Sequence, residues 1–203
     1  MSPPQVPPTD ADLKIALPAA DQVAGAARVA GIAPNFESNP AADFKLPDGR
    51  FDGPTEFAAV IRLAFAAAAA QGWREIIICD ANFASWPLGE RAVAQCLQEW
   101  SKTGRTLTVL ARDYNEVIRR HARFVSWRRT WSHIIECRSN TAVAEEDFPS
   151  AFWSPIWCCQ KLDVPHSRGV ASPEAVRRVV IRERLNECLR RSSPAFAATT
   201  LGL

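Results

Sequence analysis

The amino-acid sequence predicts an α/β domain with a parallel or mixed central sheet and helices on both of its faces. Three short, continuously apolar segments begin near residues 75, 106 and 132, and a helical pattern separates each from the next. Continuous apolarity is typical of strands that are covered on both sides, as in a parallel sheet. Strand–helix–strand repetition at this spacing indicates right-handed crossover connections.

The positions of proline and tryptophan divide the 203-residue chain. Nine of the 15 prolines lie in the first 54 residues, and all seven tryptophans lie between Trp73 and Trp157. We therefore predict an acidic, proline-rich segment over residues 1–50 that is partly irregular or disordered, or that wraps on the domain. The α/β domain is predicted over residues 51–192, and a C-terminal tail over residues 193–203.

The elements of the domain follow from the spacing of apolar residues. Residues 54–71 are apolar on most sides, which predicts a buried helix that ends at Gly72. Ser85, Asp113 and Ser172 are predicted N-caps of three further helices. The second helix ends near Thr103, the third is continuous up to the strand that begins at Ser132, and the last runs to about Arg191. Strands are predicted over residues 75–80, 106–111, 132–138, 151–161 and 167–171.

Composition excludes several classes of protein. The 24 basic and 22 acidic residues nearly cancel, so total charge does not indicate a nucleic-acid partner. No apolar run reaches the length of about 18 residues that a membrane span needs. The N-terminus has no basic region followed by an apolar stretch, so no signal peptide is predicted. The six cysteines form no C-x-x-C pair, and we expect buried, reduced thiols in a cytoplasmic protein without a metal or cofactor.

Polar residues follow the predicted parallel strands at their carboxyl ends, where ligands of α/β proteins gather. These candidate ligand-binding residues are Asp80, Asn82, Arg112, Asp113 and Arg138. Two acids and two arginines at one edge can hold a phosphate or a sugar. In the alternative interpretation they are structural, since Asp113 caps a helix and either arginine can pair with Asp80.

The third predicted helix is rich in arginine, which suits it to bidentate contacts with phosphate. The predicted basic surface consists of Arg119, Arg120, Arg123, Arg128 and Arg129. The last helix adds Arg177, Arg178, Arg182, Arg184, Arg190 and Arg191. If both helices share a face, an anionic ligand or nucleic acid is a plausible partner. The alternatives are a solvated helix face and a docking site for the acidic residues 1–50.

Known catalytic motifs are absent from the sequence. It contains no nucleophile elbow, phosphate-binding loop, dinucleotide fingerprint or H-E-x-x-H pattern. The three histidines, His121, His133 and His166, are far apart and form no site in sequence. This pattern of absences favours a domain without catalytic activity.

Residues 51–203 resemble an uncharacterised proteobacterial domain family that is distantly similar to one half of the phospholipase D-like fold. The resemblance is carried by Asp80-x-x-Phe83-x-x-Trp86-Pro87-Leu88, by Leu110-Ala111-Arg112-Asp113-Tyr114 and by Arg120-His121-x-Arg123-Phe124-Val125. Phospholipase D-like catalysis uses His-x-Lys-x-x-x-x-Asp. With Asp163 as its acid, that pattern places Ile156 and Cys158 where the histidine and lysine belong, so the family's catalysis is not expected here.

Three functions are therefore compatible with the sequence. In the first, a non-catalytic module binds an anionic ligand or a protein partner through its arginine-rich helices. The second is a hydrolase or transferase that acts on a phosphorylated or sugar substrate at the strand ends, with Asp80, Arg112 and Asp113. The third is a scaffolding subunit docked through its tryptophan-rich middle.

Overall fold

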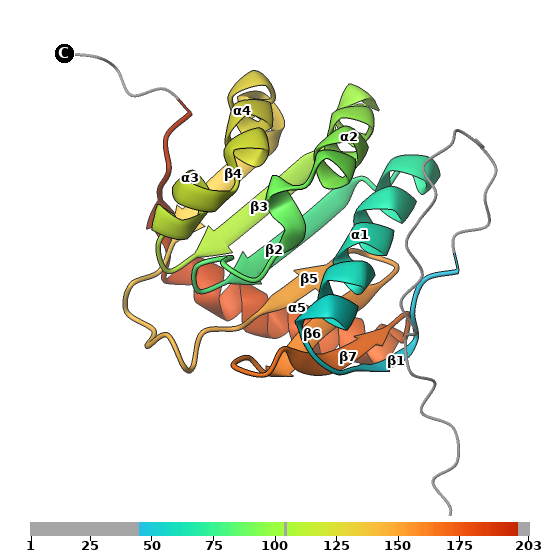
Figure 1. Ribbon diagram of the computed structural model, residues 1–203. Helices are drawn as coiled ribbons and strands as arrows, with labels where there is room; N and C mark the ends of the chain where they lie inside the picture. The colour runs from blue at the N-terminus through green and yellow to red at the C-terminus, as the bar shows by residue number, and fades with distance from the viewer. Residues whose placement is uncertain (1–44, 104, 199–203) are drawn as a thin grey trace, which may run out of the picture.

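The computed structural model describes residues 45–103 and 105–198 and shows a mixed eight-stranded sheet with helices on both faces (Figure 1). In sheet order the strands are β1 (Gly49–Phe51), β7 (Arg168–Ser172), β6 (Cys158–Asp163), β5 (Ala151–Trp153), β2 (Glu75–Asp80), β3 (Thr106–Ala111), β4 (Ile135–Ser139) and β8 (Ser193–Pro194). The helices are α1 (Pro54–Gln71), α2 (Arg91–Trp100), α3 (Asn115–Arg120), α4 (Ala122–Thr130) and α5 (Ala175–Arg190). The structure also contains three short 3-10 turns, which are η1 (Pro87–Gly89), η2 (Ser101–Thr103) and η3 (Ser132–Ile134). No helix in the described ranges has the length and apolar character needed to cross a bilayer.

The three predicted parallel strands are present, but the third begins at Ile135, because Ser132–Ile134 form the 3-10 turn η3. β2 pairs with β3 in parallel from Glu75 opposite Thr106 to Asp80 opposite Ala111, and β3 pairs with β4 in the same sense. The carboxyl ends of these three strands therefore lie at one edge of the sheet. The remaining pairs are antiparallel, which makes the sheet mixed.

The helices form two layers, one on each face of the sheet, and alternate side chains of β2 pack against one layer or the other. Ile76 and Ile78 belong to the core under α1, α2 and α4, whereas Ile77 and Cys79 pack with Ile181 and other residues of α5. Side chains of a strand alternate between the two faces of its sheet, so a continuously apolar strand is buried on both. Figure 1 shows α5 on the opposite side of the sheet from α1 to α4. The arginine-rich helices thus do not share a face.

The predicted helix over residues 54–71 is confirmed, together with the reasons for its ends. Pro54 occupies the first turn, where its missing N–H costs no hydrogen bond. Gly72 ends the helix in the left-handed conformation, with φ 68° and ψ 46°. Nine of its 18 residues are buried, in agreement with the apolarity around most of the helix.

Two predicted elements are divided in the structure. The third predicted helix is interrupted at His121, whose φ of −115° and ψ of 48° are not helical, and its Nε2 lies 2.9 Å from the carbonyl oxygen of Phe83. The predicted strand over residues 151–161 is a hairpin of β5 and β6, because Ser154 and Trp157 close a turn with a 2.9 Å backbone hydrogen bond. Both interruptions depend on contacts that apolar spacing does not show.

Smaller corrections concern the helix starts and the domain limits. The helix predicted to begin at Ser85 is a 3-10 turn at Pro87 followed by α2, for which Glu90 is the N-cap. The predicted limit at residues 50 and 51 falls inside β1, which pairs with β7, and the predicted tail contributes β8 to the opposite end of the sheet. The prediction for residues 1–44 lies outside the described residues.

Candidate functional site

Asp80 lies at the carboxyl end of β2, and its carboxylate is buried with 4% of its surface exposed. Oδ1 accepts the backbone N–H groups of Asn82 and Phe83 at 3.2 and 2.9 Å. Oδ2 accepts the indole N–H of Trp86 at 2.9 Å and the hydroxyl of Ser150 at 2.6 Å. Four neutral donors therefore satisfy this carboxylate, which fixes the loop that follows β2.

The loops after β2 and β3 meet, as the sequence predicts. The backbone N–H groups of Arg112 and Asp113 both donate to the carbonyl oxygen of Ala81. Asp113 accepts the N–H of Asn115 at 3.0 Å, so it orders the entrance of α3.

A third loop, residues 140–149, covers this edge. Asn82 donates to the Glu145 carboxylate at 3.0 Å, and Arg112 donates to the Val143 carbonyl at 3.3 Å. Two of the predicted ligand-binding side chains thus hold the loop in the structure. Their proposed role toward a ligand stays a prediction.

Arg138 does not join the other four predicted residues. Ile135 and Cys137 of β4 belong to the core under α1 to α4, so Arg138 faces α5. Its guanidinium donates to Glu136 at 2.9 Å and to the hydroxyl of Ser192 at 2.6 Å. Arg138 therefore lies near the same edge of the sheet as Asp80 and Arg112, at the carboxyl end of β4, but its side chain is on the face that α5 covers.

Two residues that the sequence analysis did not predict as site residues, Lys161 and Ser85, lie beside Asp80. The ammonium of Lys161, in β6, donates to the hydroxyl of Ser85 at 2.6 Å and lies 3.8 Å from Asp80 Oδ2. Lys161 is buried, with 3% of its surface exposed, whereas Ser85 is exposed. Burial lowers the pKa of the Lys161 ammonium, although Asp80 acts in the opposite direction. The sequence signal that could have identified Lys161 is a lysine within a mostly apolar predicted strand.

The predicted basic surface is retained in four of its five residues. Arg119 and Arg120 both pair with Glu116 at 2.5 Å, and these arginines hold the pKa of that carboxyl below its ordinary value. Arg123 donates to the carbonyl of Gly89 at 3.0 Å, and Arg129 is exposed on α4. We call Arg119, Arg120, Arg123 and Arg129 the α3–α4 arginine surface.

Arg128 is a correction to that prediction, because only 5% of its surface is exposed. Its Nε donates to the Cys137 thiol at 3.0 Å, and its guanidinium lies 4.5 Å from the ring centroid of Phe196. Adjacent arginines on a helix point about 100° apart, so Arg129 is outside while Arg128 is inside.

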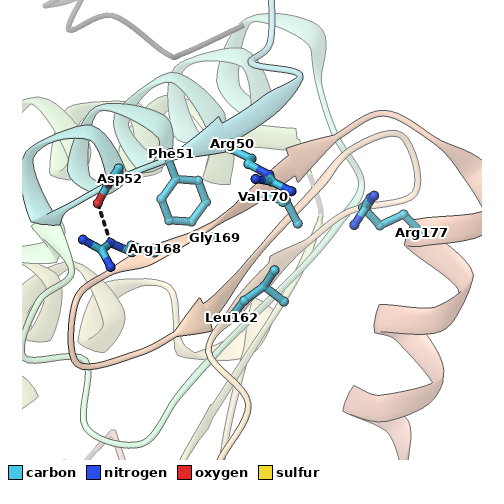
Figure 2. A pocket seen from close by; sticks show the side chains of 8 residues that line it. All are labelled: Arg50, Phe51, Asp52, Leu162, Arg168, Gly169, Val170 and Arg177. Atoms are coloured by element: carbon cyan, nitrogen blue, oxygen red, sulfur yellow. Dashed lines mark hydrogen bonds and ion pairs between the residues drawn. The ribbon is translucent and has the colours of Figure 1, made fainter. Parts of the chain in front are cut away.

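An open pocket of about 720 Å³ lies at the β1 end of the sheet (Figure 2). Arg50, Arg168 and Arg177 line it from β1, β7 and α5, together with Asp52. Arg168 pairs with Asp52 at 2.8 Å, and Figure 2 shows Arg50 and Arg177 on the other side of the pocket. This second group of guanidinium groups was not predicted as a site, because Arg50 is far from Arg168 and Arg177 in the sequence.

The buried thiols do not form a reactive site in the part of the chain that the structure describes. All six cysteines are free and buried, and burial raises the pKa of Cys96 and Cys158 to about 11 and of Cys159 to about 12. Thiols with raised pKa are poor nucleophiles. In residues 45–103 and 105–198, no group of three or more His, Cys, Asp or Glu side chains is arranged to hold a metal ion.

Comparison with known proteins gives a fold relationship. No family model matches the chain, and no curated protein matches it. A solved structure of TrmBL2, an archaeal chromatin protein with a novel mode of DNA binding, is similar with a TM-score of 0.54 and 10% sequence identity. The similarity covers 76% of this chain and 56% of that one. At this identity it shows a shared α/β fold.

Proposed function

We propose that this protein binds an anionic polymer, with nucleic acid as the preferred class, through the α3–α4 arginine surface, and that this surface has no catalytic role. The observation that carries this proposal is the exposure of four arginines on two short consecutive helices. Glu116 is the one carboxylate among the described residues that pairs with them. The local balance of four positive charges and one negative charge favours a polyanion.

Aromatic side chains at the end of α4 support nucleic acid over other polyanions. Trp131 is half-buried and His133 is exposed, with ring centroids 5.8 Å apart. They follow Arg129 closely in the chain. Aromatic rings next to arginines offer stacking surfaces to unpaired bases as well as contacts to phosphates.

Two further points belong to the same proposal. The DNA-binding function of TrmBL2 makes DNA a reasonable first probe for a domain of similar fold. The six free thiols favour a reducing compartment, and on that basis we propose a cytoplasmic location. A distant phospholipase D-like origin without that family's catalytic motif also remains part of the proposal.

A charge-matched pair of variants tests the location of the binding surface. Arg119, Arg123 and Arg129 are replaced by alanine in one variant, and Arg50, Arg168 and Arg177 in the other. Fluorescence anisotropy with labelled single-stranded DNA, duplex DNA and RNA gives the affinity of each. We expect the first variant to bind at least about tenfold more weakly, a change of about 1.4 kcal/mol, and the second to bind nearly as the unaltered protein does.

The opposite ranking would move the proposed site to the pocket of Figure 2 and contradict the role of the α3–α4 arginine surface. Equal losses in both variants would indicate attraction by total charge without a defined surface. No measurable binding to any of the three probes would refute nucleic acid as the ligand class. Heparin serves as an additional probe that carries charge without bases.

A further inference from the structure

The Lys161 ammonium is buried beside an exposed hydroxyl rather than in direct contact with a carboxylate. Only 1% of its side chain is exposed, its Nζ lies 2.6 Å from Ser85 Oγ, and the carboxylate of Asp80 is 3.8 Å away. The ring of Phe57 covers it at 4.0 Å from Nζ to the centroid. A buried ammonium normally has hydrogen-bonded carboxylate partners, because charge is costly to remove from water.

Asp80 lies close enough to attract the ammonium, but it does not hydrogen-bond it, and its two oxygens already accept four neutral donors. Among the described residues, the shortest contact of Lys161 is therefore a serine hydroxyl that reaches the surface. A structural ion pair does not require a serine hydroxyl between the ammonium and the surface. A catalytic group of nucleophile, base and more distant carboxylate does require that order.

The Ser85 loop is held firmly in position. Phe83 has a φ of 60°, which is strained for a bulky residue, and Asp80 binds its backbone N–H at 2.9 Å. The N–H of Trp86 donates to the Phe83 carbonyl at 3.1 Å and closes a turn around Ser85. Nucleophilic serines are commonly presented on sharp, constrained turns.

We propose that Ser85 is a nucleophile for acyl transfer, that Lys161 accepts its proton, and that Asp80 stabilises the ammonium that results. The three residues have the roles of a serine triad: Ser85 is the nucleophile, Lys161 takes the place of the histidine base, and Asp80 is the supporting carboxylate. This activity is separate from polyanion binding, since the α3–α4 arginine surface contributes none of the three residues.

The step begins with the neutral amine of Lys161. The Ser85 Oγ–H bond breaks and its proton moves to Nζ, while Oγ forms a bond to the carbonyl carbon of an activated ester. The tetrahedral intermediate collapses, the ester C–O bond breaks, and the alcohol component leaves as its anion. Lys161 then releases the proton to that anion or to water, and a water molecule later hydrolyses the acyl-serine to the free acid. Ser85 is exposed, so the substrate class is a small ester that approaches from solvent.

The test treats the full chain with p-nitrophenyl acetate and locates acetyl groups by peptide mass spectrometry. We expect Ser85 to be acetylated at least tenfold faster than Ser126, an exposed serine on α4. Ser85→Ala removes the modification. Lys161→Met slows acetylation at Ser85 at least tenfold, while circular dichroism reports whether the fold is retained.

A second variant and a pH series keep the test decisive if Lys161→Met does not fold. Lys161→Arg retains the positive charge next to Asp80 but cannot accept a proton near neutral pH, so acetylation at Ser85 falls as it does in Lys161→Met. In the unaltered protein the rate rises with pH, with a midpoint below 10.5, the ordinary pKa of lysine. Acetylation only at other residues, or an unchanged Ser85 rate in Lys161→Arg, would overturn the proposal. Neither result affects the proposed polyanion binding.

Discussion

Charged residues are used in opposite ways at the strand ends and on the α3–α4 arginine surface. At the strand ends Asp80 is buried and bound by four donors, and Lys161 is buried beside it. On α3 and α4, Arg123 and Arg129 are exposed, and neither forms an ion pair with a described carboxylate. Removing one partner from a group of buried charges destabilises the fold strongly, whereas exposed charge contributes little to stability and is accessible to a ligand. The comparison predicts that substitutions at the strand ends lower the stability of the protein, whereas substitutions on the α3–α4 arginine surface lower its affinity for a ligand.

The largest expected loss of stability follows from Asp80→Ala. The substitution leaves the N–H groups of Asn82, Phe83 and Trp86 without their acceptor, and it removes the carboxylate beside the buried Lys161. We expect the free energy of unfolding to fall by about 3–5 kcal/mol, measured by urea denaturation. Asp113→Ala is the matched control, since it removes one hydrogen bond at the entrance of α3 and costs about 1 kcal/mol.

The predicted N-cap role of Asp113 is not observed, since Tyr114 is the N-cap of α3. Equal losses in the two aspartate variants would show that Asp80 is no more important to the fold than an acceptor of one hydrogen bond. A stable Asp80→Ala protein would also remove the reason for treating the strand ends as a structural cluster.

The next largest effect distinguishes two adjacent arginines. Arg128→Ala removes a buried side chain that contacts Cys137 and Phe196, so we expect a loss of about 2 kcal/mol, largely from packing. Arg129→Ala removes an exposed side chain and changes the free energy of unfolding by less than about 0.5 kcal/mol. Urea denaturation of both variants measures the difference. Equivalent stabilities would mean that burial does not separate the two arginines.

The smallest effect concerns the thiols. All six cysteines are buried, and burial holds the pKa of Cys159 at about 12, so few thiolates form at pH 7.5. We expect no cysteine to react with a disulfide reagent within minutes in the native protein, and six to react in concentrated guanidinium chloride. A rapidly reacting thiol in the native state would reveal an opening of the core that the fold does not show.

The parallel part of the fold could be predicted because its signals are local. The apolar residues of β2 and β3 are continuous in sequence, and Gly72 ends α1 by its own conformational freedom. The break at His121 could not be predicted, because it depends on a contact with Phe83, 38 positions away. The edge strand β8 was also missed, since two residues carry no periodic pattern.

The candidate sites show the same limit. The exposed arginines of α3 and α4 could be predicted because they lie close together in the sequence, whereas the burial of Arg128 could not. The contact between Ser85 and Lys161 joins residues 76 positions apart, and it depends on the order β6–β5–β2 in the sheet. The placement of Arg138 on the opposite face depends on the register of β4, which its sequence does not fix.

The salt dependence of DNA affinity tests the central claim most directly. The logarithm of the association constant is measured against the logarithm of salt concentration for the unaltered protein and for a variant with Arg119, Arg120, Arg123 and Arg129 replaced by alanine. Each phosphate contact on duplex DNA contributes a slope of about −0.9. We predict that the magnitude of the slope falls by about 3–4 in the variant, while its free energy of unfolding changes by no more than about 1–2 kcal/mol. Identical slopes would contradict the account, because they would show that these arginines do not meet the phosphates.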